Sequence, residues 1–240
     1  MLYLIHAARE FGAFKRVVLL SATPHPEVRA WIDNLLAPYE ITMETTTTHP
    51  ICGERRVAHD IELTTLRATR EQVVNVAYAK VMELLPQICN LRAARSGDAK
   101  YVPCVIILNS VVKAIELEQM LLDSGIAKER IVPIRGMSAR AVRRLHSDMW
   151  IVIGTSAIEV GIDFQCDYLL FEAGDAASFM QRFGRLGRHA PGQAYLLAGD
   201  RECRVIDASS FISRSELEEK VARTYTEANA KAWFVKTELG

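Results

Sequence analysis

The sequence predicts an α/β protein whose core is a parallel β-sheet covered by helices on both faces. Short apolar runs recur along the chain with helical patterns between most of them, an alternation that is typical of parallel sheets. Half of the 240 residues are hydrophobic, which allows a chain of this length to bury a sizeable core. The predicted strands span residues 60–66, 102–108, 131–134, 150–153, 168–171 and 194–197.

The first fifty residues carry a shorter version of the same pattern. An apolar run at 17–20 predicts a buried strand that ends at Ser21-Ala22-Thr23-Pro24, and residues 26–36 have helical periodicity. Residues 37–59 lose this periodicity and include four consecutive threonines, so they predict a crossing between two domains. We expect the tail of a first domain and its linker at 1–50, a second domain at 51–205 and the start of a C-terminal extension at 206–240.

A long helix is predicted directly after the strand at 60–66. Thr69 and Gln72 match a T-x-x-Q capping box, and an apolar stripe at helical spacing follows them. Pro86 and the charged stretch behind it should end or kink this helix. Further along the chain, residues 215–225 predict a charged helix.

Polar residues follow several predicted strands at the point where each strand ends. Parallel sheets bind ligands at the carboxyl ends of their strands, and backbone amides with hydroxyls at a helix N-terminus can hold a phosphate. A helix cap at Ser110 would explain that residue without any ligand. The residues at these strand ends are Asn109, Ser110, Gly136, Gly154, Thr155 and Ser156, of which Ser110, Gly136, Thr155 and Ser156 are the candidates for binding.

The most informative stretch is Asp175-Ala-Ala-Ser-Phe-Met-Gln-Arg-Phe-Gly-Arg-Leu-Gly-Arg188. On one continuous helix, Gln181, Arg185 and Arg188 would share a face opposite to an apolar face. Gly184 and Gly187 would each cost about 1 kcal/mol inside that helix, so a close approach to a ligand or to a second domain is expected to offset them. A solvated arginine face on a core helix is the alternative interpretation.

The overall charge argues against a large positive field. Lys plus Arg and Asp plus Glu both number 29, so any nucleic-acid site must be a local basic patch. The candidate residues for such a patch are Arg135, Arg140, Arg143, Arg144, Arg182, Arg185 and Arg188.

Cysteine spacing and hydropathy predict the redox state of the thiols and the cellular location of the protein. The five cysteines form no C-x-x-C pair, which favours reduced thiols and no metal site. No apolar run reaches the roughly 18 residues that span a bilayer. We therefore expect a soluble, cytoplasmic protein without a membrane partner.

Two motifs, in order and at plausible spacing, resemble those of superfamily 2 helicases. GTSAIEVGIDF resembles their motif V and QRFGRLGR their motif VI, while Ser21-Ala22-Thr23 resembles motif III and ILNSVVKA loosely resembles motif IV. The resemblance implies a RecA-like second domain preceded by the tail of a first RecA-like domain. SATPHPEVRAW and GDAASFMQRFGRLGRHAPG, taken with motif V, look most like the helicase subunit of type I CRISPR interference systems, the type I-D form above all.

The resemblance also implies roles for individual residues. Arg188 would be an arginine finger with Arg185 beside it, and Gln181, Gly161 and Asp163 would approach the nucleotide. Ser21 and Thr23 would couple the nucleotide site to domain movement. Ser110, Gly136, Thr155 and Ser156 would contact nucleic acid. The implied cofactors are ATP and Mg²⁺, and the implied partners are single-stranded or duplex DNA (RNA also fits), a first ATPase domain, a CRISPR effector complex and a nuclease.

One departure from the helicase pattern bears on mechanism. Neither a GxxxxGK[ST] phosphate loop nor a DExD/H box occurs in the 240 residues, so we expect this polypeptide alone to hydrolyse no ATP. The first ATPase domain would belong to a longer chain or to a separate one. A nucleic-acid-binding scaffold without ATPase activity and an unrelated α/β enzyme for a phosphorylated substrate remain as alternatives.

Overall fold

The computed structural model describes residues 11–12, 59–135, 146–158, 164–206 and 213–225. The chain divides into two compact units, Met1–Arg55 and Arg56–Gly240, and the elements below all belong to the second. The predicted strand at 17–20 and the predicted helix at 26–36 lie outside the described residues.

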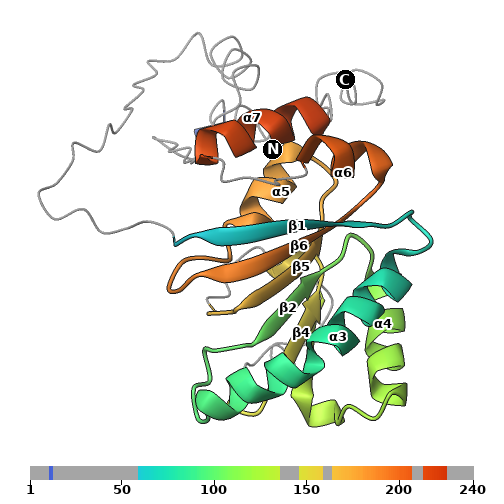
Figure 1. Cartoon of the computed structure of the whole chain (residues 1–240), viewed down its shortest axis with the longest axis vertical. Coiled ribbons are helices and arrows are strands. Elements are labelled where there is room, and N and C mark those ends of the chain that lie inside the picture. Colours follow the sequence, from blue (N-terminus) through green and yellow to red (C-terminus); the bar gives the residue numbers. More distant parts are fainter. Residues whose placement is uncertain (1–10, 13–58, 136–145, 159–163, 207–212, 226–240) are drawn as a thin grey trace, which may run out of the picture. The chain divides into compact units, whose positions relative to one another are not determined.

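The second unit is built on a six-stranded sheet in which every neighbouring pair of strands is parallel, in the order β1-β6-β5-β2-β4-β3 (Figure 1). This arrangement confirms the predicted fold class and all six predicted strands. The strands are β1 (Ile61–Arg67), β2 (Cys104–Ile107), β3 (Ile131–Ile134), β4 (Ile151–Gly154), β5 (Tyr168–Glu172) and β6 (Gly192–Ala198).

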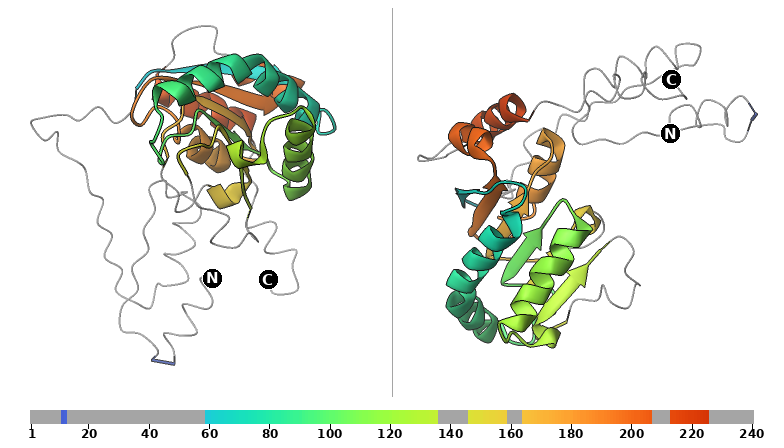
Figure 2. Two further views of the ribbon diagram at one scale, coloured as in Figure 1. Left: turned by 90° about the horizontal axis from the view of Figure 1, so that it is seen from below. Right: turned by 90° about the vertical axis from the view of Figure 1, so that its right-hand side faces the viewer.

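Helices bury both faces of the central strands, so β2 and β4 are buried throughout. The edge strand β1 instead alternates between half-buried and exposed residues along much of its length. Val105 and Ile107 of β2 belong to the hydrophobic cluster that includes Phe179 and Val221. The alternate β2 residues Cys104 and Ile106 belong to a second cluster on the other face of the sheet. That cluster includes buried residues from the helices at 73–94 and 111–123. Figure 2 shows the two helical layers with the sheet between them.

Helices α3 (Val73–Ala94) and α4 (Val111–Asp123) cover one face. Helices α5 (Ala176–Phe183), α6 (Asp200–Ile206) and α7 (Arg214–Thr224) supply the opposite layer. Two single turns of 3-10 helix, η1 (Lys128–Arg130) and η2 (Ser156–Ile158), precede β3 and follow β4. The helix predicted at 215–225 is thus confirmed as α7, which begins at a capping box between Ser213 and Glu216.

The capping box predicted for α3 forms only in part. The Gln72 Oε1 atom accepts from the Thr69 backbone N–H at 3.3 Å and from the Thr69 hydroxyl at 3.1 Å. Gln72 occupies the N-cap position without a side-chain cap hydrogen bond, so the helix begins at Val73, later than a cap at Thr69 implies.

The prediction that Pro86 could end this helix is wrong, since α3 continues for two more turns to Ala94. Proline removes one hydrogen bond and crowds the preceding turn, but burial beyond it compensates. Ile88 is fully buried and Arg92 is nearly so, one and two turns after the buried Leu84. The Arg92 guanidinium donates to the carbonyl oxygens of Asp98 at 3.1 Å and Tyr101 at 2.8 Å, so tertiary contacts outweigh the local break.

Candidate nucleotide and nucleic-acid sites

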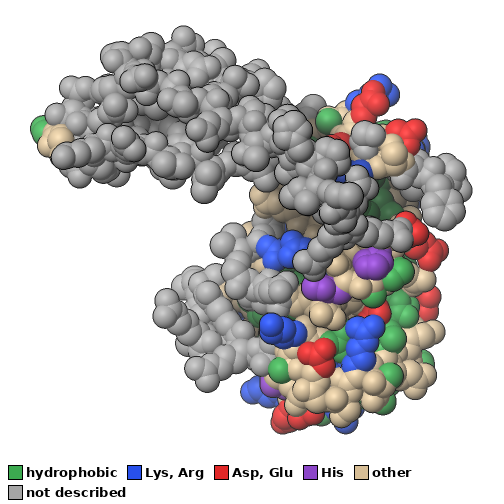
Figure 3. Space-filling view, turned by 90° about the vertical axis from the view of Figure 1, so that its left-hand side faces the viewer, with side chains coloured by type: hydrophobic (Ala, Val, Ile, Leu, Met, Phe, Trp, Pro, Cys, Tyr) green, Lys and Arg blue, Asp and Glu red, His purple; other side chains and the backbone are tan. Residues whose placement is uncertain are grey.

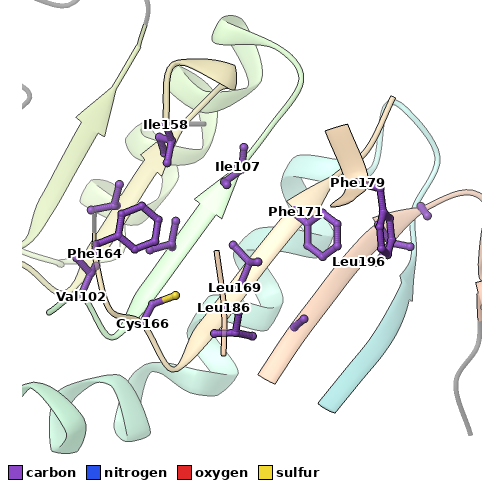
Figure 4. Packing of buried hydrophobic residues seen from close by; sticks show 14 of the residues in the cluster. Val102, Ile107, Ile158, Phe164, Cys166, Leu169, Phe171, Phe179, Leu186 and Leu196 are labelled. Carbon is purple, nitrogen blue, oxygen red and sulfur yellow. The ribbon is translucent and has the colours of Figure 1, made fainter. Parts of the chain in front are cut away.

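Helix α5 carries the arginine-rich motif and begins at a well-formed capping box. The Asp175 Oδ1 atom accepts from the Ser178 N–H at 2.7 Å, and the Ser178 Oγ atom accepts from the Asp175 N–H at 3.2 Å. One turn later Phe179 is fully buried against Phe171 of β5, with ring centroids 5.2 Å apart and edge-to-face (Figure 4). The capping box sets the residue at which α5 begins, and the aromatic contact holds this helix against β5.

The predicted continuous helix through Arg188 is wrong, because α5 ends at Phe183. Gly184 is the C-cap residue, and its N–H donates to Met180 O at 2.9 Å. Gly187 has a φ of +75°, a conformation that glycine adopts without strain and that no α-helix contains. Gln181, Arg185 and Arg188 therefore do not share one helix face.

The close approach predicted for these glycines occurs within the domain itself. A Cβ atom built on Gly187 would lie 2.8 Å from the Ile61 Cδ1 atom and 3.1 Å from the His59 carbonyl oxygen. The Gly187 carbonyl oxygen accepts from the His59 N–H at 2.7 Å. The expectation of a ligand or a second domain at this position is thus replaced by a contact with the start of β1.

Gly187→Ala should lower the free energy of unfolding by more than about 1 kcal/mol. The methyl group would be strained at positive φ and would also press on Ile61. Urea denaturation of the purified chain measures the change. Gly174→Ala is the matched control, since its new methyl would meet nothing closer than 3.9 Å. Equal stability of the Gly187 and Gly174 variants would contradict the described contact.

The arginine-bearing turn, residues 184–188, lies at the amino edge of the sheet. Leu186, only 2% exposed, anchors it in the core, and the Arg188 Nε atom donates to Gly184 O at 2.9 Å. Burial raises the pKa of the Cys166 thiol just before β5, and the Arg188 cation opposes this increase. Figure 3 looks onto this side and shows described Lys, Arg and His side chains gathered with acidic ones between them.

The exposure of the predicted nucleotide residues differs along this turn. Gln181 and Arg188 are exposed, and Arg185 is half-buried. Arg182, predicted as part of a basic patch, is instead 4% exposed. It follows Phe179 by three residues and so falls on the buried side of α5.

The predicted nucleic-acid residues that the structure describes lie at the opposite, carboxyl edge. Thr155 directly follows β4 and is buried, and its N–H donates to Ile134 O at 3.4 Å. Ser156 is exposed at the start of η2. Ser110 occupies the N-cap position of α4 but makes no side-chain cap hydrogen bond, so the predicted capping role of its hydroxyl is wrong. Arg135, another patch candidate, is ion-paired with Glu118 of α4.

A charged cluster beside Ser110 was not predicted. The Asn109 N–H donates to the Glu172 Oε2 atom at 2.8 Å, and the Lys113 Nζ atom lies 2.9 Å from Glu172 Oε1. The Arg182 Nη1 atom donates to Asn109 Oδ1 at 2.6 Å and also to the Glu172 carbonyl oxygen. The cluster thus joins α5 to the ends of β2 and β5, two strands that pair directly.

A cavity of about 220 Å³ adjoins this cluster at the carboxyl ends of β1, β6 and β5. Thr69, Glu172, Gly199 and Tyr225 are among its lining residues. The Tyr225 hydroxyl is buried and has no hydrogen-bond partner within the described part of the chain. Burial raises the pKa of Tyr225, so the phenol is protonated at neutral pH.

The remaining candidates lie outside the described residues. They are Ser21, Thr23, Gly136, Arg140, Arg143, Arg144, Gly161 and Asp163. Within the described ranges, no group of His, Cys, Asp and Glu side chains could hold a metal ion. No helix in the same ranges is long and apolar enough to cross a membrane.

Solved structures share this fold at low sequence identity. S. cerevisiae Dbp5 bound to RNA and ADP BeF3 is 17% identical over 92% of this chain and 53% of its own, with a TM-score of 0.55. The DEAD-box helicase Mss116 bound to ssRNA and UDP-BeF is 14% identical over 86% of this chain and 43% of its own, with a TM-score of 0.50. The domain therefore has the fold of a helicase C-terminal RecA-like domain.

The chain spans only part of such relatives, for example 20% of the E. coli DExH-box NTPase HrpB chain. No curated protein matches the sequence. A family model does match, over residues 100–191, and it describes the C-terminal part of the CRISPR-associated nuclease/helicase Cas3. Residues 100–191 are thus similar to the C-terminal part of Cas3, and the described domain has the fold of a helicase C-terminal RecA-like domain.

Proposed function

We propose that this chain is the C-terminal motor half of an ATP-dependent helicase that unwinds or translocates on target DNA during CRISPR interference. The observation that carries the proposal is the placement of the two predicted sets of residues at opposite edges of one sheet. Arg185 and Arg188 occupy the amino edge, and Ser110, Thr155 and Ser156 occupy the carboxyl edge. One rigid domain can then hold a nucleic-acid strand at one edge and reach a nucleotide at the other.

At the amino edge, Arg188 would serve as the arginine finger with Arg185 beside it. Phosphoryl transfer spreads negative charge over three equatorial oxygens, and a planar guanidinium fork matches that charge better than an ammonium group does. Leu186, which lies between the two arginines in the sequence, is buried in the core. Its burial holds the turn that carries both arginines against the domain. Gln181, Gly161 and Asp163 would complete the nucleotide contacts on this side.

A first RecA-like domain would bind most of the ATP and Mg²⁺. Its phosphate loop and acidic residues would hold the β- and γ-phosphates and the metal, groups that the 240 residues do not supply. Ser21 and Thr23 would couple that domain to this one. The similarity to the CRISPR-associated nuclease/helicase Cas3 supports a CRISPR effector complex and a nuclease as further partners. DNA as the nucleic acid, a type I-D system and a cytoplasmic location belong to the same proposal.

At the carboxyl edge, the backbone and hydroxyls after β2 and β4 would hold phosphates of one strand. Contacts of this kind position a strand without reading its sequence. Ser156 is exposed, and Gly136 with the arginines between 135 and 144 follows β3, the strand next to β4.

Binding of a single-stranded oligonucleotide should accordingly weaken as salt rises. Arg143→Ala should lower the slope of log Kd against log salt by about 0.7, the value for one phosphate contact on a single strand. Thr155→Ala should weaken binding by about two- to tenfold, the net value of one hydrogen bond. Fluorescence anisotropy across a salt series measures both effects.

Exposed residues away from this edge supply the matched controls. Thr64→Ala on β1 and Arg223→Ala on α7 remove the same groups from exposed sites, and both should leave affinity and slope unchanged. Salt-independent binding, or a Thr155→Ala and Arg143→Ala double variant that binds like wild type, would remove the carboxyl edge from the proposal.

A further inference from the structure

Arg182 makes two kinds of contact at once, one with its side chain and one with its backbone. Its guanidinium reaches back toward the start of α5, as long helical side chains do, and binds Asn109 Oδ1 at 2.6 Å. Its carbonyl oxygen accepts from the Arg185 N–H at 2.9 Å. The same residue therefore contacts the neighbour of Ser110 and the first residue of the predicted arginine pair.

The contacts continue without a gap to Arg188. The Gly184 N–H also donates to the Arg182 carbonyl oxygen, and the Gly184 carbonyl oxygen accepts from Arg188 Nε at 2.9 Å. At the other end, Glu172 holds the Asn109 backbone N–H at 2.8 Å. A hydrogen-bonded path thus runs from the carboxyl edge of the sheet to the turn at its amino edge.

A buried charged residue is a costly way to fill this place in the core. Arg182 is 4% exposed, and burying a guanidinium costs several kcal/mol before its partners offset the cost. A well-packed apolar residue of similar volume is often as stabilising as a buried ion pair. The geometric specificity of the fork, which requires Asn109 and the end of β5 in one arrangement, is what an apolar residue would not supply.

We propose that Arg182 is a positioning residue that couples nucleic-acid binding at the carboxyl edge to the placement of Arg185 and Arg188. This inference rests on the proposed helicase function. A strand that contacts Ser110 also contacts or displaces the exposed Asn109, and a shift of the Asn109 amide moves the acceptor of Arg182. Because the Arg182 carbonyl oxygen accepts from the N–H groups of Gly184 and Arg185, that shift reaches the arginine-bearing turn.

The test measures linkage between the two ligands in the complete helicase, which joins this chain to its first RecA-like domain. The Kd of a single-stranded oligonucleotide is determined with and without a non-hydrolysable ATP analogue. Two sites coupled in the usual range change each other's affinity by about 5- to 150-fold. The Kd of the analogue with and without oligonucleotide must change by the same factor, which checks the measurement.

Two variants should bring this factor close to one. Asn109→Ala removes the oxygen that Arg182 binds, and Arg182→Lys keeps the charge but loses the fork. Asn109→Asp retains an oxygen acceptor and should keep the factor. Asn90→Ala and Arg223→Met, at exposed positions on α3 and α7, are the matched controls and should also keep it. Asn109 is itself exposed, so its variants test the idea even where a substitution of Arg182 lowers the melting temperature.

The outcomes separate the inference from the function on which it rests. If Arg182 had a purely structural role, its variants would lower the melting temperature or weaken oligonucleotide binding equally with and without the ATP analogue. The ratio of those two Kd values would then stay unchanged. Retention of the full factor in Asn109→Ala and in folded Arg182→Lys would overturn the inference and leave the proposed function intact. A wild-type helicase whose factor is already one would overturn both.

Discussion

Arg188→Ala should lower ATP turnover by the complete helicase by about two to five orders of magnitude. This range spans the values for lost electrostatic donors and for arginine fingers. The guanidinium is expected to stabilise negative charge on the transferring phosphoryl group. This charge develops only as the transition state forms. Steady-state phosphate release at saturating ATP and nucleic acid measures the loss. Affinity for nucleic acid without nucleotide should change little, because that contact lies at the other edge of the sheet.

Arg188→Lys should restore little of the lost turnover, since it keeps the charge without the fork. Arg201→Ala, an exposed arginine on α6, is the matched control and should retain turnover. Arg188 is exposed, and substitutions at exposed positions usually change stability by no more than about 0.5 kcal/mol, so the melting temperature should barely fall. Near-wild-type turnover in a folded Arg188→Ala helicase would remove the arginine-finger assignment.

The sheet could be predicted from the sequence because the central strands β2, β4 and β5 are buried and therefore form short apolar runs. The edge strand β1 was predicted from its alternation of apolar and polar residues, and all six predicted strands occur in the structure. The strand order could not be predicted in this way, because it depends on which crossovers pack where. Glu172 at the end of β5 meets Asn109 after β2 only because these strands pair, although the two residues lie 63 positions apart.

The positions of the candidate residues in the fold were predicted correctly at strand ends and wrongly at the end of a helix. Thr155 and Ser156 follow β4 as expected. The helical periodicity of the sequence continues through Arg188, but Gly184 and Gly187 are ordinary stop signals for a helix. The free-energy cost of two glycines inside a helix also favoured an end at Phe183. The spacing of Phe179, Arg182 and Phe183 also indicated that Arg182 faces inward.

The effects at the two edges depend on a rigid α5, and the fully buried Phe179 tests that rigidity. Its ring contacts Phe171 of β5, lies stacked 5.7 Å from the Phe183 ring, and packs 6.1 Å from the Tyr225 ring at the end of α7. One side chain thus joins the arginine-bearing helix to the sheet and to the outer helix. Its loss would leave a cavity lined by aromatic rings that cannot collapse without moving a strand.

Phe179→Ala should therefore lower the free energy of unfolding by about 3–5 kcal/mol, a large part of the roughly 5–15 kcal/mol of a typical domain. Urea denaturation of this chain measures the change, with the midpoint falling at unchanged slope. Val112→Ala on α4 is the control, because that valine is 72% exposed and its loss should change stability by no more than about 0.5 kcal/mol. A decrease below about 1 kcal/mol for Phe179→Ala would mean that α5 does not pack on β5 as described, and the positions derived for Arg182, Arg185 and Arg188 would then lose their support.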